Sequence, residues 1–243
     1  MRLGAQLNSA TVGEIIRSVI FYVTFYGFSL FLVIWTGLLL LLGGRGFVTS
    51  VVGWSRFHRW CVRNILGIKV VVEGALPPGR IMVASKHESF FEAIDMPTLL
   101  PQPVVFAKAE LFKVPLWGPA AQAWGNIPVE REAGAKALRL MVSEAKRLTA
   151  GGRPLAIFPE GTRVPHGDAP GLQSGFAGLY KLIGVPVVPI AVNSGALYHH
   201  RWKRRGTITI RVGEAIPPGL PRAEIEARVH AAINSLNPTK VVE

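Results

Sequence analysis

The longest feature in the hydrophobic pattern is an uncharged apolar run near the start of the chain. Residues 19–42 read VIFYVTFYGFSLFLVIWTGLLLLL and contain no Asp, Glu, Lys or Arg. A helix of this length, at about 1.5 Å per residue, is long enough to cross a hydrocarbon core of roughly 30 Å. The run is also much longer than the h-region of a cleaved signal peptide, which has about 7 to 15 residues. The pattern therefore predicts a membrane-anchoring helical segment at the N-terminus.

Two arrangements of this segment in a membrane fit the sequence. It forms either one span or a bent helix pair, hinged near Gly27 or Gly37, that enters one leaflet and returns. Aromatic residues at positions 21, 22, 25, 26 and 28 favour contact with a membrane interface. Cations are more frequent after the run, at Arg45, Arg56, Arg59, Arg63 and Lys69, than before it, at Arg2 and Arg17. By the positive-inside rule, both arrangements place the rest of the chain on the cytoplasmic side, at the inner membrane in a bacterium.

The next segment, residues 46–66, mixes aromatic with basic side chains. Trp54, Phe57 and Trp60 lie among several arginines, which is typical of a basic helix at a membrane interface. The same composition fits a helix packed on the protein, with its arginines in water. We therefore predict a first unit, residues 1–66, made of the membrane anchor and this basic helix.

Beyond residue 67 the pattern changes to short β-branched runs that alternate with helical stretches. The predicted strands are IKVVVEG, IMVAS, VVFAK, PLAIFP, VPVVPIAV and TITIRVG. Apolar residues at helical spacing predict helices over residues 132–149 and 222–236. This alternation indicates an α/β domain, with a mixed sheet flanked by helices, over residues 67–243.

Composition narrows the range of partners. A formal charge of +12 favours nucleic acid, anionic lipid surfaces or acidic substrates, and the apolar N-terminus argues against nucleic acid. The basic run at residues 199–205 suits docking to anionic head groups, or it forms a solvated loop. Cys61 is the only cysteine, so the chain has no intrachain disulfide and offers no zinc-ligand cluster. We expect no metal site.

The candidate chemistry begins at the end of the second predicted strand, where IMVAS leads into KHESFFEAIDMP. A neutral imidazole at His87 is suited to take a proton from an alcohol near pH 7. Glu92, five residues later, is the first candidate to orient this histidine and stabilise its charged form. Ser89 and Glu92 also match a capping box, which gives Glu92 a purely structural alternative. Asp95, one helical turn further on, competes for the same role.

These residues, together with three later segments, resemble the glycerolipid acyltransferase family. The later segments are KAELFKVPLWGPAAQAWGNIPVER from Lys108, FPEGTR at residues 158–163 and VPVVPI at residues 185–190. The chain departs from the family pattern at Glu92, where the family has aspartate. The resemblance implies that His87 deprotonates the hydroxyl of a lysophospholipid, whose alkoxide attacks an acyl thioester. It implies no cofactor, with acyl-CoA or acyl carrier protein as the donor substrate.

The resemblance also assigns binding roles residue by residue. Lys108 and Arg131 are candidates for contact with the acceptor phosphate, because an anionic head group needs cations in its cleft. Glu160, Gly161 and Arg163 carry the acceptor-binding role of the family's Glu-Gly-Thr-Arg motif. In the VPVVPI segment, which resembles the family's fourth motif, the resemblance assigns acyl-donor binding or oxyanion support to Val188 and Pro189.

The function implied by the resemblance is transfer of a fatty acyl chain to the sn-2 hydroxyl of 1-acylglycerol 3-phosphate, which forms phosphatidate. An alternative within the family is another lysolipid acceptor, such as a lyso-ornithine lipid or lysophosphatidylcholine. An alternative from a different class is a noncatalytic membrane-remodelling scaffold on the same fold. The presence of His87, Glu160 and Arg163 counts against the scaffold.

Overall fold

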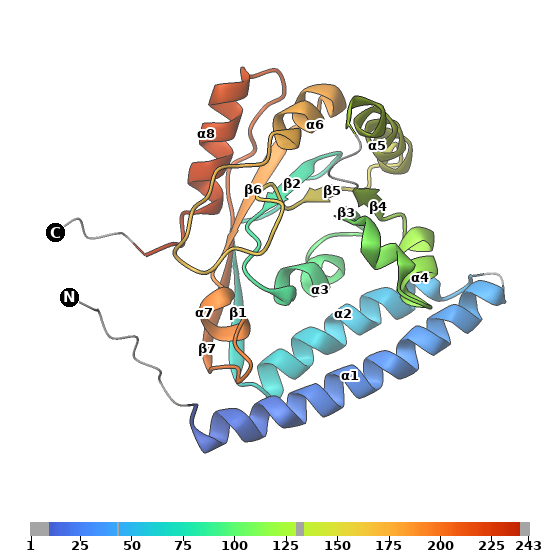
Figure 1. The fold of residues 1–243 in the computed structure, drawn as a ribbon, viewed down its shortest axis with the longest axis vertical. Helices are drawn as coiled ribbons and strands as arrows, with labels where there is room; N and C mark the ends of the chain where they lie inside the picture. The colour runs from blue at the N-terminus through green and yellow to red at the C-terminus, as the bar shows by residue number, and fades with distance from the viewer. Residues whose placement is uncertain (1–9, 43, 130–133, 239–243) are drawn as a thin grey trace.

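The computed structural model describes residues 10–42, 44–129 and 134–238. Its first two helices, α1 (Val12–Leu41) and α2 (Phe47–Asn64), form a hairpin that lies along one side of the molecule (Figure 1). The side chain of Thr11 caps α1, and the helix then runs unbroken for 30 residues. The alternative hinge near Gly27 or Gly37 is therefore wrong. The chain reverses only after α1, where Gly44 and Gly46 have φ values of 74° and 82°, a region that favours glycine.

One side of α1 packs on the rest of the protein, whereas the remainder is exposed. Phe21 and Phe25 are buried, and they contact the ring of His58 on α2. The large exposed apolar residues of α1 are Val12, Ile16, Val19, Ile20, Val23, Tyr26, Phe28, Leu30, Phe31, Ile34, Trp35, Leu38 and Leu41. Among the described residues, α1 is the one helix that is long and apolar enough to cross a membrane.

Helix α2 packs against both α1 and α3 (Phe90–Leu99). Its inner face buries Ser55, His58 and Cys61, whereas Arg56 and Trp60 on the outer face are exposed. The segment is therefore a packed helix that keeps some basic and aromatic residues at the surface.

A seven-stranded sheet with the order β1-β7-β6-β2-β5-β3-β4 forms the centre of the α/β region. The strands are β1 (Ile68–Glu73), β2 (Met82–Ser85), β3 (Val104–Lys108), β4 (Ile127–Val129), β5 (Leu155–Ile157), β6 (Val187–Val192) and β7 (Gly206–Val212). Among the strand pairs of the described residues, only β6 with β7 is antiparallel. The predicted mixed sheet and all of its predicted strands are confirmed, and β4 is additional.

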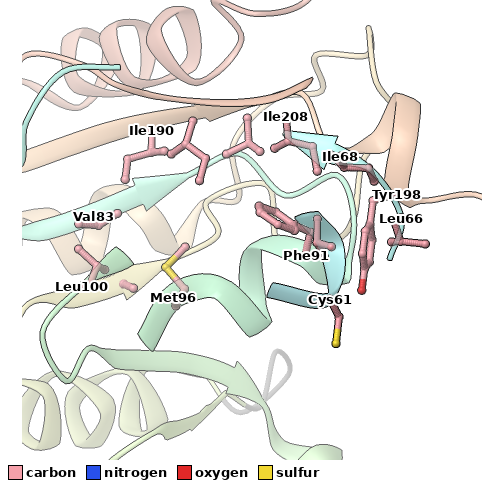
Figure 2. Close-up of a cluster of buried hydrophobic side chains, with 14 of the residues drawn as sticks. Cys61, Leu66, Ile68, Val83, Phe91, Met96, Leu100, Ile190, Tyr198 and Ile208 are labelled. Carbon is pink, nitrogen blue, oxygen red and sulfur yellow. The ribbon is translucent and has the colours of Figure 1, made fainter. Parts of the chain in front are cut away.

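Helices cover both faces of this sheet (Figure 1). They are α3 (Phe90–Leu99), α4 (Trp117–Trp124), α5 (Gly134–Thr149), α6 (Gly175–Ile183), α7 (Gly195–Tyr198) and α8 (Arg222–Ile233), with the 3₁₀ turn η1 (Ala109–Lys113) before α4. Alternation along β2 separates two cores, because Val83 points to the cluster with α2 and α3 while Met82 points to the cluster with α5, α6 and α8. Figure 2 shows the first cluster, in which Phe91, Ile190 and Cys61 are buried together.

The parallel strands bring their carboxyl ends to one edge of the sheet. Ala84 on β2 is in register with Ile157 on β5, and Lys108 on β3 is in register with Val129 on β4. The segments that follow these strands therefore meet, although they are far apart in sequence. Ligand sites of open α/β sheets lie at this edge.

Candidate active site

The segment between β2 and α3 places His87 and Glu92 together. Ser89 caps α3: its Oγ accepts the backbone N–H of Phe91 at 3.0 Å, and its own N–H donates to Glu92 Oε2 at 2.9 Å. The predicted capping box is thus present. The same Glu92 Oε2 lies 3.1 Å from Nδ1 of His87. Glu92 therefore combines the capping contact with the contact to the histidine.

The ring of His87 is held on two sides. It stacks on Phe158 with ring centroids 4.1 Å apart, and its side chain is 16% exposed. A carboxylate at Nδ1 favours the tautomer with a proton on that nitrogen, which leaves a lone pair on Nε2. No hydrogen bond from the described residues occupies Nε2. This nitrogen is free to accept a proton from a ligand.

Asp95 is engaged elsewhere. Its Oδ1 accepts from Nε of Arg59 on α2 at 2.8 Å, and its Oδ2 pairs with the terminal nitrogen of the same guanidinium. Burial raises the pKa of Asp95, and the contact with Arg59 opposes that shift. The structure thus brings Glu92 to His87 and joins Asp95 to α2.

Ser194, which sequence reasoning missed, completes the surroundings of Glu92. It follows β6, and its Oγ contacts Oε1 of Glu92 and lies 2.7 Å from Oγ of Ser89. All three side chains are buried. Two hydroxyl groups and a backbone N–H therefore fix the carboxylate that faces His87. A signal was present in the sequence, since Ser194 comes two residues after a predicted strand.

A buried ion pair lies beneath the histidine segment. Nζ of Lys86 is 2.6 Å from Oε1 of Glu160 and also donates to the Asp168 carbonyl and to Asn234 Oδ1, each at 2.8 Å. Both charged side chains are fully buried. Glu160 Oε2 lies 3.4 Å from the backbone nitrogen of His87. The carboxylate expected to bind the acceptor thus faces Lys86 and the backbone of the histidine segment.

Gly161 follows in a tight turn. Its φ of 72° is in the left-handed region, and a Cβ there would lie 2.7 Å from the side chain of Gln173. Both features require glycine. Within the protein the close neighbour of Gly161 is Gln173, and the close approach of its backbone to a ligand stays a prediction.

Arg163 lies beside the histidine. The backbone N–H of Val164 donates to the carbonyl of His87 at 2.7 Å, which ties the two segments together. The Arg163 guanidinium lies 4.1 Å above the ring of Phe90. The side chain is exposed, and no carboxylate of the described residues pairs with it. This cation is available to an anionic ligand.

The other predicted binding residues differ in position. Lys108 ends β3 at the same sheet edge, with its side chain 56% exposed and Nζ 3.4 Å from Glu110. Val188 and Pro189 are buried within β6, where Pro189 is in register with Ala84. They lie in the strand beside β2, and their predicted role in donor binding or oxyanion support stays a prediction. Arg131 lies outside the described residues.

A second histidine–carboxylate pair braces the same region and was also missed by sequence reasoning. Glu88 Oε1 lies 2.9 Å from Nδ1 of His166, and Oε2 accepts the N–H of Gly195 at 2.7 Å. Burial raises the pKa of Glu88, whereas the His166 and Gly195 contacts lower it. Glu88 therefore joins the segment after β5 to the start of α7. No cluster of metal-ligand side chains occurs in the described part of the chain.

Known proteins share sequence with this chain over much of its length. The family model described as Acyltransferase matches residues 67–193. The chain is 32% identical over 170 residues to a 1-acyl-sn-glycerol-3-phosphate acyltransferase of Pseudomonas aeruginosa, a match that covers 68% of this chain and 66% of the relative. It is 28% identical over 163 residues to the human beta form of that enzyme, covering 65% of this chain and 59% of the relative. The matches thus span less than two thirds of these relatives.

A solved structure shares the fold. The crystal structure of the 1-acyl-sn-glycerophosphate acyltransferase PlsC from Thermotoga maritima superposes with a TM-score of 0.72, at 20% sequence identity. The superposition covers 91% of this chain and 95% of that one. The match is longer than the α/β region alone, so it includes at least part of the N-terminal helical unit.

Proposed function

This chain belongs to the acyltransferase family, and on that basis we propose that it transfers a fatty acyl chain from a thioester to the sn-2 hydroxyl of 1-acylglycerol 3-phosphate, forming phosphatidate. The observation that carries the proposal is the pairing of His87 with Glu92 next to the unpaired Arg163. A base and a cation for an anionic acceptor thus lie on two segments that are bonded to each other at the sheet edge.

The proposed reaction needs no covalent intermediate on the protein. Nε2 of His87 removes the proton from the acceptor hydroxyl as its oxygen attacks the carbonyl carbon of the thioester. The tetrahedral intermediate then collapses, the C–S bond breaks, and the leaving thiolate takes the proton from the imidazolium. Glu92 stabilises the imidazolium and keeps the ring oriented, with Ser89 and Ser194 holding the carboxylate.

The binding roles follow the positions of the cations. Arg163 and Lys108 are proposed to contact the acceptor phosphate, because both are exposed and lie at the ends of strands that reach the edge with His87: Lys108 ends β3, and Arg163 follows β5. Arg131 stays a candidate. Glu160 and Gly161 are proposed to shape the segment that carries Arg163, and Val188 and Pro189 to support it from within the sheet. Acyl-CoA or acyl carrier protein remains the expected donor.

We further propose that α1 holds the enzyme at a membrane with the catalytic domain on the cytoplasmic side. The large apolar side chains exposed along α1 support membrane contact. The excess of cations after residue 42 supports the cytoplasmic side. The lysolipid then reaches His87 without leaving the membrane surface.

A radiolabelled acyl-transfer assay tests the proposal. Membranes containing the protein are offered lysophosphatidate, lysophosphatidylcholine or a lyso-ornithine lipid, each with acyl-CoA and with acylated carrier protein. We expect labelled phosphatidate from lysophosphatidate and little product from the other acceptors. Preferential acylation of another lysolipid would overturn the acceptor assignment. A folded protein that acylates none of them would instead favour the noncatalytic scaffold.

A further inference from the structure

An open groove of about 260 Å³ lies between α1 and the segment that follows α7. It is lined by Tyr22, Tyr26, Phe90, Arg163, Tyr198, His199, His200, Arg201 and Lys203. Phe90 and Arg163 connect it to the catalytic histidine, since Phe90 begins the helix that follows His87 and the Arg163 segment is bonded to the His87 carbonyl. Tyr22 and Tyr26 belong to α1 and form the wall of the groove on that side.

The groove is cationic and its lining contains no carboxylate. Neither Arg163 nor Arg201 forms an ion pair with the described residues; each guanidinium lies over an aromatic ring, that of Phe90 at 4.1 Å and that of Trp202 at 4.9 Å. Burial, with the nearby charge of Arg163, lowers the pKa of His199. The lowered pKa favours neutral His199, so the exposed positive charges of this lining that lack a protein anion are those of Arg163 and Arg201.

Contacts with α1 fix the segment that carries Arg201. The hydroxyl of Tyr22 donates to the Arg201 carbonyl at 2.6 Å, and the backbone N–H of Lys203 donates to Oγ of Ser18 at 2.8 Å. Lys203 itself is buried, and its Nζ donates to the Tyr198 carbonyl at 2.8 Å. The backbone of Arg201 and the buried Lys203 thus hold this basic run against α1, while His199, His200, Arg201 and Arg205 remain exposed, as in a solvated loop.

The position of the groove specifies the ligand. One wall belongs to the helix that exposes apolar side chains, and the other end reaches the segment of the catalytic histidine. A ligand that fits both has an anionic head and an alkyl chain. A phosphomonoester on a lysolipid has this form, and two guanidinium groups can hold its oxygens with charge-assisted hydrogen bonds.

We propose that this groove admits the lysolipid acceptor from the membrane, and that Arg201 binds its phosphate together with Arg163. The inference rests on the proposed function and adds a specificity-determining residue to it. Arg201 makes the site select a phosphomonoester over an uncharged head group. The acyl chain of the acceptor lies toward Tyr22 and Tyr26 on α1.

The kinetic test uses the full-length protein in neutral detergent micelles, with lysophosphatidate and the uncharged 1-acylglycerol as acceptors. Arg201→Ala should raise KM for lysophosphatidate about tenfold or more, whereas KM for the donor and the rate with 1-acylglycerol stay unchanged. Arg201→Lys should give an intermediate KM. Arg205→Ala is the matched control, since it removes the same charge from an exposed residue that does not line the groove.

Folding of the variant is checked by its unfolding temperature. The Tyr22 hydroxyl donates to the backbone carbonyl of residue 201, so truncation of the Arg201 side chain leaves that hydrogen bond in place. An Arg201→Ala variant whose KM matches that of Arg205→Ala would overturn the proposal. A loss confined to anionic vesicles, with normal KM in micelles, would assign Arg201 to docking on the membrane surface and would also overturn it.

A binding arm separates this inference from the proposed function. His87→Ala protein, with and without Arg201→Ala, is titrated with lysophosphatidate, 1-acylglycerol and inorganic phosphate. We expect Arg201→Ala to weaken lysophosphatidate binding about tenfold and to leave 1-acylglycerol binding unchanged, with inorganic phosphate competing only weakly. If wild type shows no acyl transfer while this binding difference persists, the result supports binding of the phosphate by Arg201 and contradicts the proposed acyl transfer. Equal binding of lysophosphatidate with and without the Arg201 side chain contradicts the proposed role of Arg201, whether or not wild type catalyses acyl transfer.

Discussion

Oε2 of Glu92 lies 3.1 Å from Nδ1 of His87 and accepts the backbone N–H of Ser89 at 2.9 Å. One carboxylate oxygen thus contacts both the proposed base and the start of the helix that carries the carboxylate. Helix α3 begins at Phe90, three residues after His87, and Ser89 caps it. The cap therefore fixes the position of Glu92 relative to His87. The contacts that both predicted roles of Glu92 require therefore coexist.

This arrangement predicts unequal effects of two neutral substitutions in α3. Glu92→Gln should lower kcat by roughly 10²-fold or more, because the imidazolium loses its counter-charge. Its stability should change little, since glutamine also fits a capping box. Asp95→Asn should leave kcat within a few-fold while lowering stability through the loss of charge opposite Arg59. Steady-state kinetics and denaturant unfolding measure both effects, and the reverse order in kcat would transfer the orienting role to Asp95.

The buried pair of Lys86 and Glu160 predicts a strong energetic coupling. Lys86→Met leaves a buried carboxylate without its partner and should cost about 3–5 kcal/mol of unfolding free energy. The double variant with Glu160→Gln should recover much of that loss. Denaturant unfolding of the two single variants and the double variant gives the coupling. If the losses of unfolding free energy were additive, Lys86 and Glu160 would not be coupled. If Glu160→Gln also raised KM for the acceptor without changing stability, Glu160 would be in contact with the acceptor instead.

His58 predicts a loss of stability in mild acid. Burial, aided by the charges of Lys203 and Arg59, lowers its pKa from 6.5 to about 3, so the unfolded chain alone binds a proton between these values. Stability should therefore fall as the pH drops below about 6.5, by about 1.4 kcal/mol per pH unit from this group. Unfolding in detergent at pH 7.5 and pH 5 measures the change.

A pair of variants isolates the contribution of His58. His58→Phe should lower the stability at pH 7.5, since Tyr198 loses its partner, but should remove most of the additional loss at pH 5. His200→Gln, at an exposed position, should retain the full pH dependence of wild type. The same pH dependence in His58→Phe would show that other groups cause it.

The exposed face of α1 predicts that salt alone does not release the protein from membranes. Apolar contacts persist at 1 M salt, where the Debye length is only about 3 Å, so the protein should stay in the pellet after high-salt and alkaline washes. Leu30→Glu combined with Ile34→Glu changes two exposed positions of α1 and should shift the protein toward the supernatant. Release of wild type by salt would mean that basic residues alone hold it.

Local patterns in the sequence were sufficient for most of the fold. Each predicted strand forms, because β-branched runs of this length are favoured in a buried sheet. Strand β4 was missed, since a three-residue strand that contains Pro128 gives no periodic signal. The position of the reversal after α1 was also missed. Gly27 and Gly37 are tolerated inside a long helix, and the chain turns at Gly44 and Gly46 instead.

The site was predictable only where its contacts are local. His87 and Glu92 are close in sequence, and the capping box was readable directly. Lys86 and Glu160 are 74 residues apart, and Glu92 and Ser194 are 102 apart. Such pairs depend on which strands become neighbours in the sheet, and that order is set by packing across the whole domain. The sequence therefore suggested the base and its carboxylate, and the supporting contacts required the structure.

His87 is proposed to act as the general base of acyl transfer to lysophosphatidate. The most direct measurement of this role is the initial rate of phosphatidate formation by purified wild type and His87→Ala in the same detergent, with unfolding temperatures confirming that both are folded. We predict a rate about 10² to 10⁴-fold lower for His87→Ala, with KM for lysophosphatidate little changed. Phosphatidate formation at the wild-type rate by folded His87→Ala protein would contradict the account.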